Sequence, residues 1–142
     1  MDIAEVKKRF VEEVKLRAYD DKYIDKDEER EILQIAIQQG VGVDAGRSAL
    51  AQVCEAQGYV LESVALNKVK EVLETFAQND GKIDQKEFND ALTICKKATQ
   101  GKRNEVQVKK MVIELIDDNS WKCKQGMFNH WYDNIRKEVG MV

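Results

Sequence analysis

Acidic residues stand at matching places in two stretches of this sequence. The first stretch contains Asp21, Asp25 and Glu28, and the second contains Asp80, Asp84 and Glu87. In both, an Asp is followed three residues later by a Glu, which is the pattern of a capping box at a helix start. Carboxylate oxygens in a turn are also ligands that a hard divalent cation prefers. The two stretches therefore predict helix caps or cation ligands, and both interpretations stay open.

Amphipathic helices are expected on both sides of each acidic stretch. Apolar residues recur at spacings of three and four, typical of one helix face, over 2–16, 25–39, 44–57, 63–77, 84–98 and 104–118. The chain contains no proline, the residue that most strongly interrupts helices. We therefore predict an all-α fold of six to seven helices.

An internal repeat relates the two halves of the chain. When the sequence is shifted by 59 residues, seven of the 19 residues in 18–36 are identical to their partners, among them Ile24 and Ile83. Self-similarity at a fixed period is the mark of a duplicated structural unit. We therefore predict that the two isoleucines occupy equivalent, buried places.

The repeat also predicts the domain organisation. We expect one domain, 1–142, in which two pseudo-symmetric helix-loop-helix-helix repeats span about 3–62 and 63–124. Two short extended segments, 59–61 and 121–123, should pair with each other.

The last segment has no counterpart in the repeat, and it is rich in aromatic residues. Apolar residues at helical spacing predict a C-terminal helix over about 126–139. Its aromatic face either belongs to the core or docks a partner protein, since Trp and Tyr are favoured anchors in interfaces. The candidate docking residues are Trp121, Phe128, Trp131 and Tyr132.

Residues suited to catalysis are scarce. His130 is the only histidine, so a histidine-based acid–base system would rest on this residue alone. The three cysteines, Cys54, Cys95 and Cys123, are widely spaced and form no CxxC motif, which disfavours a zinc site and favours reduced structural thiols. We predict a protein that is not an enzyme.

The second acidic stretch resembles the second half of an EF-hand calcium loop. Asp80 matches the fifth loop position, Gly81 the turn glycine, Ile83 the apolar eighth position and Glu87 the bidentate twelfth. The first stretch, with Asp21, Ile24, Asp25 and Glu28 at the same places, resembles it less well because Lys22 replaces the glycine.

Both stretches depart from the EF-hand pattern where two ligands should stand. The first and third loop positions hold Phe76 and Gln78 in one stretch, and Arg17 and Tyr19 in the other. The resemblance therefore implies weak Ca²⁺ binding at most, and otherwise no cofactor. The ligand candidates are Asp80, Asp84 and Glu87, followed by Asp21, Asp25 and Glu28.

The segment 77–87 is also similar to a short motif of bacterial tellurite-resistance TerB-like domains. These helical domains carry an Ala, then Asp-Gly, an apolar residue and an acid before a helix, as Ala77, Asp80-Gly81, Ile83 and Asp84 do here. The similarity implies an accessory protein of a bacterial stress or signalling system, with acidic turn residues suspected of binding metal.

The overall charge narrows the class of partner. The net charge is −3 and the sequence pI about 5.3, whereas nucleic-acid binding usually needs a basic excess. No apolar run has the length of a membrane span, and the N-terminus lacks the apolar stretch of a signal peptide. We expect a cytoplasmic protein-interaction or accessory module whose partner is another protein or domain. The alternative is a regulator that binds calcium weakly.

Overall fold

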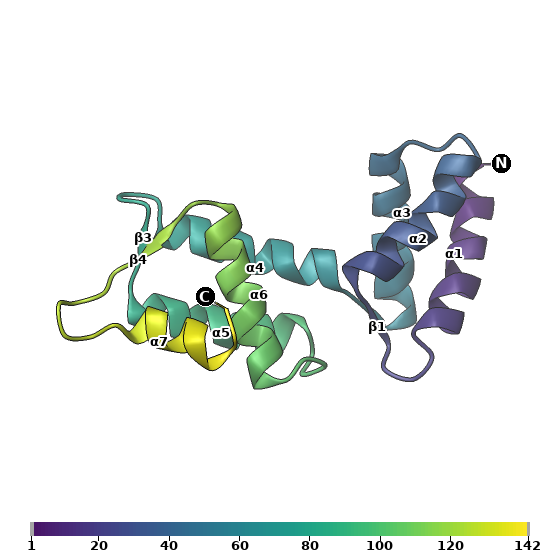
Figure 1. Cartoon of the computed structure of the whole chain (residues 1–142). Helices are drawn as coiled ribbons and strands as arrows, with labels where there is room; N and C mark the ends of the chain where they lie inside the picture. The colour runs from purple at the N-terminus through teal and green to yellow at the C-terminus, as the bar shows by residue number, and fades with distance from the viewer. Residues whose placement is uncertain (1, 142) are drawn as a thin grey trace. The chain divides into compact units, whose positions relative to one another are not determined.

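The computed structural model describes residues 2–141, which form seven α-helices and four two-residue strands (Figure 1). The predicted all-α class is therefore confirmed. The chain divides into two compact units, Met1–Val64 and Ala65–Val142, here called unit 1 and unit 2. The boundary falls in the first turn of α4 (Glu62–Phe76), close to the predicted boundary between the repeats.

Unit 1 contains three long helices and one pair of strands. In chain order these are α1 (Ile3–Arg17), β1 (Tyr23–Ile24), α2 (Lys26–Gln38), α3 (Val43–Gln57) and β2 (Val60–Leu61). Each of the three helices packs against the other two (Figure 1). The strands are parallel, with Tyr23 opposite Val60 and Ile24 opposite Leu61.

The core of unit 1 follows from the helical spacing of its apolar residues. Val6, Phe10 and Val14 lie one turn apart on α1 and are fully buried against residues of α2 and α3. Burying a side chain such as Phe10 stabilises the fold by about 1.5–3 kcal/mol. Asp2 begins α1, because its carboxylate accepts the Glu5 N–H at 2.9 Å.

Unit 2 contains four helices and a second pair of strands. After α4 come β3 (Lys82–Ile83), α5 (Gln85–Ala98), α6 (Glu105–Asp118), β4 (Lys122–Cys123) and α7 (Trp131–Glu138). The strands β3 and β4 are again parallel, with Ile83 opposite Cys123.

An aromatic cluster occupies the core of unit 2. The ring of Phe88 on α5 lies 5.4 Å from that of Trp131 and 5.8 Å from that of Tyr132, both on α7. These tilted and edge-on arrangements suit the ring quadrupoles. Val69 and Leu73 of α4 and Val112 of α6 belong to the same buried cluster.

The observed strand pairs differ from the predicted pairing, whereas the two isoleucines on the strands are buried as predicted. The segments 59–61 and 121–123 do not pair with each other, because each pairs with the acidic stretch of its own unit. The Val60 N–H donates to the Lys22 carbonyl at 2.9 Å, and the Lys122 N–H donates to the Gly81 carbonyl at 3.0 Å. Ile24 and Ile83 are both fully buried on these strands, as expected.

The C-terminal helix is shorter than predicted. It begins at Trp131 rather than near 126, so Met127 and Phe128 lie in the preceding loop. The Gln125 side-chain oxygen accepts the N–H groups of Tyr132 and Asp133 at 3.1 Å each. This amide satisfies two donors that the first turn of a helix leaves unpaired.

Candidate functional site

The two acidic stretches form turns that begin helices. Asp84 accepts the Glu87 backbone N–H at 2.7 Å, and Glu87 accepts the Asp84 N–H at 2.9 Å. Asp25 and Glu28 exchange the same pair of bonds, at 2.9 and 3.2 Å. The predicted capping boxes are therefore confirmed at the start of α5 and of α2.

A third capping box begins α6. Asn104 and Gln107 exchange the same two bonds, at 2.9 and 2.8 Å. This box was not predicted, although its residue spacing, Asn-x-x-Gln, follows the capping-box pattern.

The remaining two acids of the predicted metal set stabilise the turns themselves. Asp21 accepts the Tyr23 N–H at 3.1 Å, and Asp80 accepts the Lys82 N–H at 3.0 Å, as in an Asx turn. Lys124 Nζ also lies 3.2 Å from an Asp80 oxygen. The Lys82 N–H first, and the Lys124 ammonium second, hold the pKa of the Asp80 carboxyl below its usual value.

The structure gives no cation-binding geometry to these acids. Within residues 2–141, no three His, Cys, Asp or Glu side chains are grouped so that they could hold a metal ion. The carboxylates of the caps already bond to backbone N–H groups, and Lys124 lies beside Asp80. Calcium binding at Asp80, Asp84 and Glu87 stays a prediction.

The structure separates the four candidate docking residues into two kinds. Trp131 and Tyr132 are buried, at 6% and 8% exposure, and the Trp131 indole N–H donates to the Lys124 carbonyl at 2.7 Å. They are core residues, so a docking role for them is disfavoured. Trp121 is partly buried, whereas Phe128 is 95% exposed.

Phe128 and its neighbour Met127 form what we call the apolar tip. Met127 is 81% exposed, so these adjacent residues have the two largest exposures of any large apolar side chain within residues 2–141. Gly126 and Asn129 stand on either side of the tip in the sequence and exchange two backbone hydrogen bonds. The Gly126 N–H donates to the Asn129 carbonyl at 3.2 Å, and the Asn129 N–H donates to the Gly126 carbonyl at 3.4 Å. The loop is thus closed at its base, and both apolar side chains extend into solvent.

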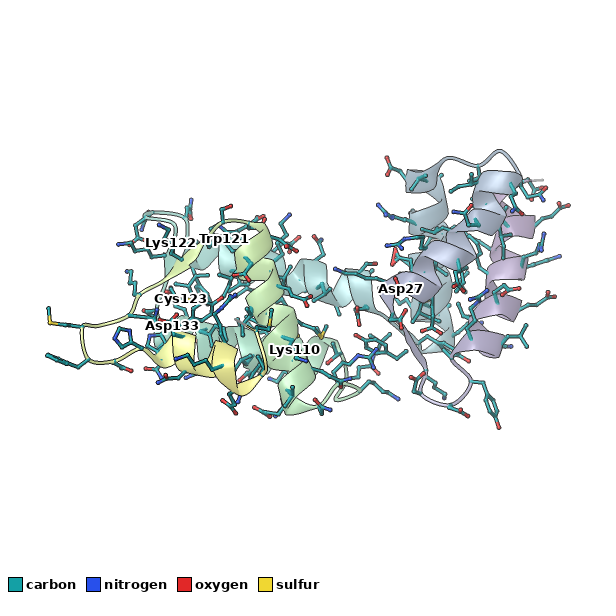
Figure 2. The ribbon with its side chains drawn as sticks, viewed as in Figure 1. Asp27, Lys110, Trp121, Lys122, Cys123 and Asp133 are labelled. Atoms are coloured by element: carbon teal, nitrogen blue, oxygen red, sulfur yellow. The ribbon has the colours of Figure 1, made fainter. Side chains whose placement is uncertain are left out.

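A polar cluster surrounds Cys123 at the end of β4. Figure 2 labels Lys122 and Cys123 on this strand, Trp121 directly before it, and Asp133 on α7. Arg136 donates to both oxygens of Asp117 at 2.9 Å. Burial first, and the charge of Asp117 second, raise the pKa of the Cys123 thiol to about 12. This thiol is therefore protonated at neutral pH and a poor nucleophile.

Unit 1 contains a pocket that the sequence did not predict. Its volume is about 400 Å³, and it is lined by α2, α3 and the start of α4. The lining residues are Lys26, Glu29, Arg30, Leu33, Gln34, Ile37, Val43, Arg47 and Ser63. A volume of this size lies within the range of small-molecule sites.

Glu29 is the unusual member of this pocket. It is only 5% exposed, and its Oε2 has no hydrogen-bond partner within residues 2–141. Its Oε1 lies 3.7 Å from Arg47 Nε, too far for a hydrogen bond. The sequence does carry a signal, because Glu29 falls in helical register with the buried Ile32, Leu33 and Ala36.

Gly46 brings the two pocket helices close together. A Cβ at this position would lie 3.2 Å from Ala36 Cβ and 3.4 Å from a Leu33 methyl, tighter than ordinary packing. The glycine therefore allows α3 to approach α2 closely, one residue before Arg47.

Comparison of this chain with protein-family models, curated proteins and solved structures finds no match. Among the helices of residues 2–141, none combines the length and the apolar character that crossing a membrane requires.

Proposed function

We propose that this chain is a non-enzymatic module that binds another protein through the apolar tip. The observation that supports this proposal is the exposure of Met127 and Phe128, at 81% and 95%, in one short loop. Exposed apolar residues that stand singly are common, but two large neighbours at a loop end favour a contact surface. Phenylalanine and methionine are both enriched in protein interfaces.

The structure around the tip favours docking without a large rearrangement. Gln125 ties one side of the loop to the start of α7, and the Gly126–Asn129 bonds close it. A loop held in one conformation loses little entropy when it binds. Burial of Phe128 in an apolar groove of a partner would contribute about 1.5–3 kcal/mol.

Site-specific photocrosslinking tests the proposal. A photoreactive phenylalanine analogue at position 128 of the full chain should capture one protein from cells that express the chain. The same analogue at Tyr19, which is 77% exposed in unit 1, serves as the matched control and should not capture that protein.

Purified components then decide the outcome. Replacing Met127 and Phe128 together by Ser should weaken binding of the captured protein at least about tenfold, equivalent to about 1.4 kcal/mol. Leu16→Ser, at an apolar residue that is 76% exposed, should leave the affinity unchanged. An affinity that the double variant does not alter would overturn the proposal.

We also propose that the two units derive from one duplicated unit. Both contain helix, strand, helix, helix and strand in this order. The Lys22 N–H donates to the Ala18 carbonyl and the Gly81 N–H to the Ala77 carbonyl, each at 2.8 Å and at positions 59 residues apart. Both residues have a positive φ, 54° and 70°. An experimental structure of each unit in which 18–36 and 77–95 fail to superpose would contradict the duplication.

Calcium regulation is the second candidate function. The positive φ of Gly81, at 70°, is the observation that favours it, because the resemblance to the EF-hand places the turn glycine at this position.

A cytoplasmic location and a role in a bacterial stress or signalling system are further proposals that rest on the sequence. Localisation of the tagged chain in its own cells tests the first of them.

A further inference from the structure

We infer that the pocket of unit 1 binds a small zwitterion of the α-amino-acid class with an apolar side chain. The ammonium group would bond to Glu29, the carboxylate would face the basic rim of Lys26, Arg30 and Arg47, and the side chain would contact Leu33, Ile37 and Val43. The inference goes beyond the proposed function, because the apolar tip belongs to unit 2.

Glu29 selects for a hydrogen-bond donor in the ligand. A buried carboxylate oxygen without a partner is costly, and Glu29 Oε2 is such an oxygen within residues 2–141. Arg47 does not satisfy it, because its Nε lies 3.7 Å from the other oxygen and its side chain is 62% exposed. An ammonium group carries three donors and a positive charge, so it fits this position.

The rim selects for an anion. Three cations, Lys26, Arg30 and Arg47, line the pocket beside one acid, Glu29. Arg30 lies 3.7 Å from Asp27, and both side chains are largely exposed, so this ion pair is weak. A guanidinium group such as that of Arg47 can bind a carboxylate through two parallel bonds.

The apolar lining residues of the pocket, Leu33, Ile37 and Val43, favour a ligand with an apolar side chain. Ile37 and Val43 are 43% and 44% exposed, and both line the pocket beside the buried Leu33. A simple cation would meet three like charges, and a simple anion would leave Glu29 Oε2 without a hydrogen-bond donor. A compact molecule that carries both charges and an aliphatic side chain satisfies all three parts of the pocket.

Binding of L-leucine to the full chain tests the inference. Backbone amide resonances of α2 and α3 should shift saturably with millimolar L-leucine. Two leucine analogues are matched probes: 3-methylbutylamine lacks the carboxylate, and 4-methylpentanoate lacks the ammonium. Each should bind at least tenfold more weakly than L-leucine. Absence of a saturable shift with L-leucine, or equal affinity for the three probes, would overturn the inference.

Variants locate the site. Glu29→Gln keeps the shape of the side chain and removes its charge, and should weaken L-leucine binding at least tenfold, as should Arg47→Gln. Lys110→Gln in unit 2 is the control and should bind as the parent does. Thermal unfolding of each variant shows that the chain is folded when binding is measured. Unchanged binding by folded Glu29→Gln would overturn the assignment.

The two proposals can fail independently. Met127→Ser with Phe128→Ser should leave L-leucine binding unchanged, and Glu29→Gln should leave photocapture at position 128 unchanged. Loss of L-leucine binding in the tip variant would contradict a site confined to unit 1.

Discussion

The first acidic turn, 18–25 in unit 1, and the second, 77–84 in unit 2, share their backbone bonds but differ at four positions, one of which has a positive φ. Each has an Asx turn, a capping box and a buried isoleucine on a short parallel strand. At the position with positive φ, the first turn has Lys22 and the second has Gly81. Side chains with a Cβ rarely adopt this conformation, so the first turn is strained where the second is not.

The electrostatic surroundings of the two turns differ as well. In the second turn, the Lys82 N–H and Lys124 lower the pKa of Asp80. In the first turn, burial raises the pKa of the capping Glu28, and the charges of Asp25 and Asp21 raise it further. The two turns therefore share a backbone conformation although their carboxylates have different charged neighbours. The conformation depends on hydrogen bonds to the main chain, and these are the same in both turns.

Truncation of the buried isoleucines should lower the free energy of unfolding more than any other substitution considered. Ile24→Ala and Ile83→Ala each remove a fully buried side chain, and each should cost about 2–5 kcal/mol in the free energy of unfolding. Ile3→Ala, at a residue that is 42% exposed, is the control with a small effect. Urea unfolding followed by circular dichroism measures all three.

The same variants test whether the chain unfolds as one domain. Trp121 and Trp131, the only two tryptophans, both belong to unit 2, so their fluorescence reports on this unit. Because each unit has its own buried cluster, Ile83→Ala should shift the fluorescence transition and Ile24→Ala should not. A shift with Ile24→Ala would favour the single domain that the sequence predicts.

Exchanging the residues with positive φ should change stability in opposite directions. Gly81→Ala should destabilise unit 2 by about 1–2 kcal/mol, the cost of a left-handed residue with a Cβ. Lys22→Gly removes that cost from unit 1 but adds entropy to the unfolded chain, so we expect a gain of about 0.5–1 kcal/mol. Thermal unfolding of both variants decides it, and a loss of stability in Lys22→Gly would contradict the strain.

The helix caps should contribute similar amounts in the two turns. Asp25→Ala and Asp84→Ala each remove one side-chain bond to a backbone N–H and should cost about 0.5–2 kcal/mol. Asp27→Ala, at an exposed residue next to the first cap, is the control. Urea denaturation that finds Asp84→Ala as stable as the parent would show that this cap contributes little.

Local patterns in the sequence predicted local structure well. The Asp and Glu spacing identified two helix starts, because a capping box involves only neighbouring residues. The predicted pairing of 59–61 with 121–123 was wrong, because strand pairing depends on how the helices of each unit pack. Apolar spacing extended the last helix over Phe128, which is 95% exposed, since periodicity does not register the Gln125 cap.

The pocket could not be predicted because it depends on contacts between helices. Glu29 and Arg47 are far apart in the sequence, yet their side chains lie 3.7 Å apart where α3 packs on α2, and Gly46 leaves room for that close approach. The sequence showed a carboxylate in register with the buried face of α2, which indicates burial but does not identify what faces it.

Added calcium should change the free energy of unfolding less than any of these substitutions, and it should show a difference between the two turns. An ion at the second turn has to displace Lys124 from Asp80 and compete with backbone N–H groups for Asp84 and Glu87. We therefore expect binding weaker than micromolar, the range of well-formed sensor loops. At a calcium concentration equal to the dissociation constant, the stabilisation would be only about 0.4 kcal/mol. Calorimetric titration measures the affinity, and Lys124→Met should increase it by removing the competing charge, whereas Lys122→Met is the control. Micromolar binding to the parent chain, or no change with Lys124→Met at a measurable affinity, would show that the ion binds elsewhere or by another geometry.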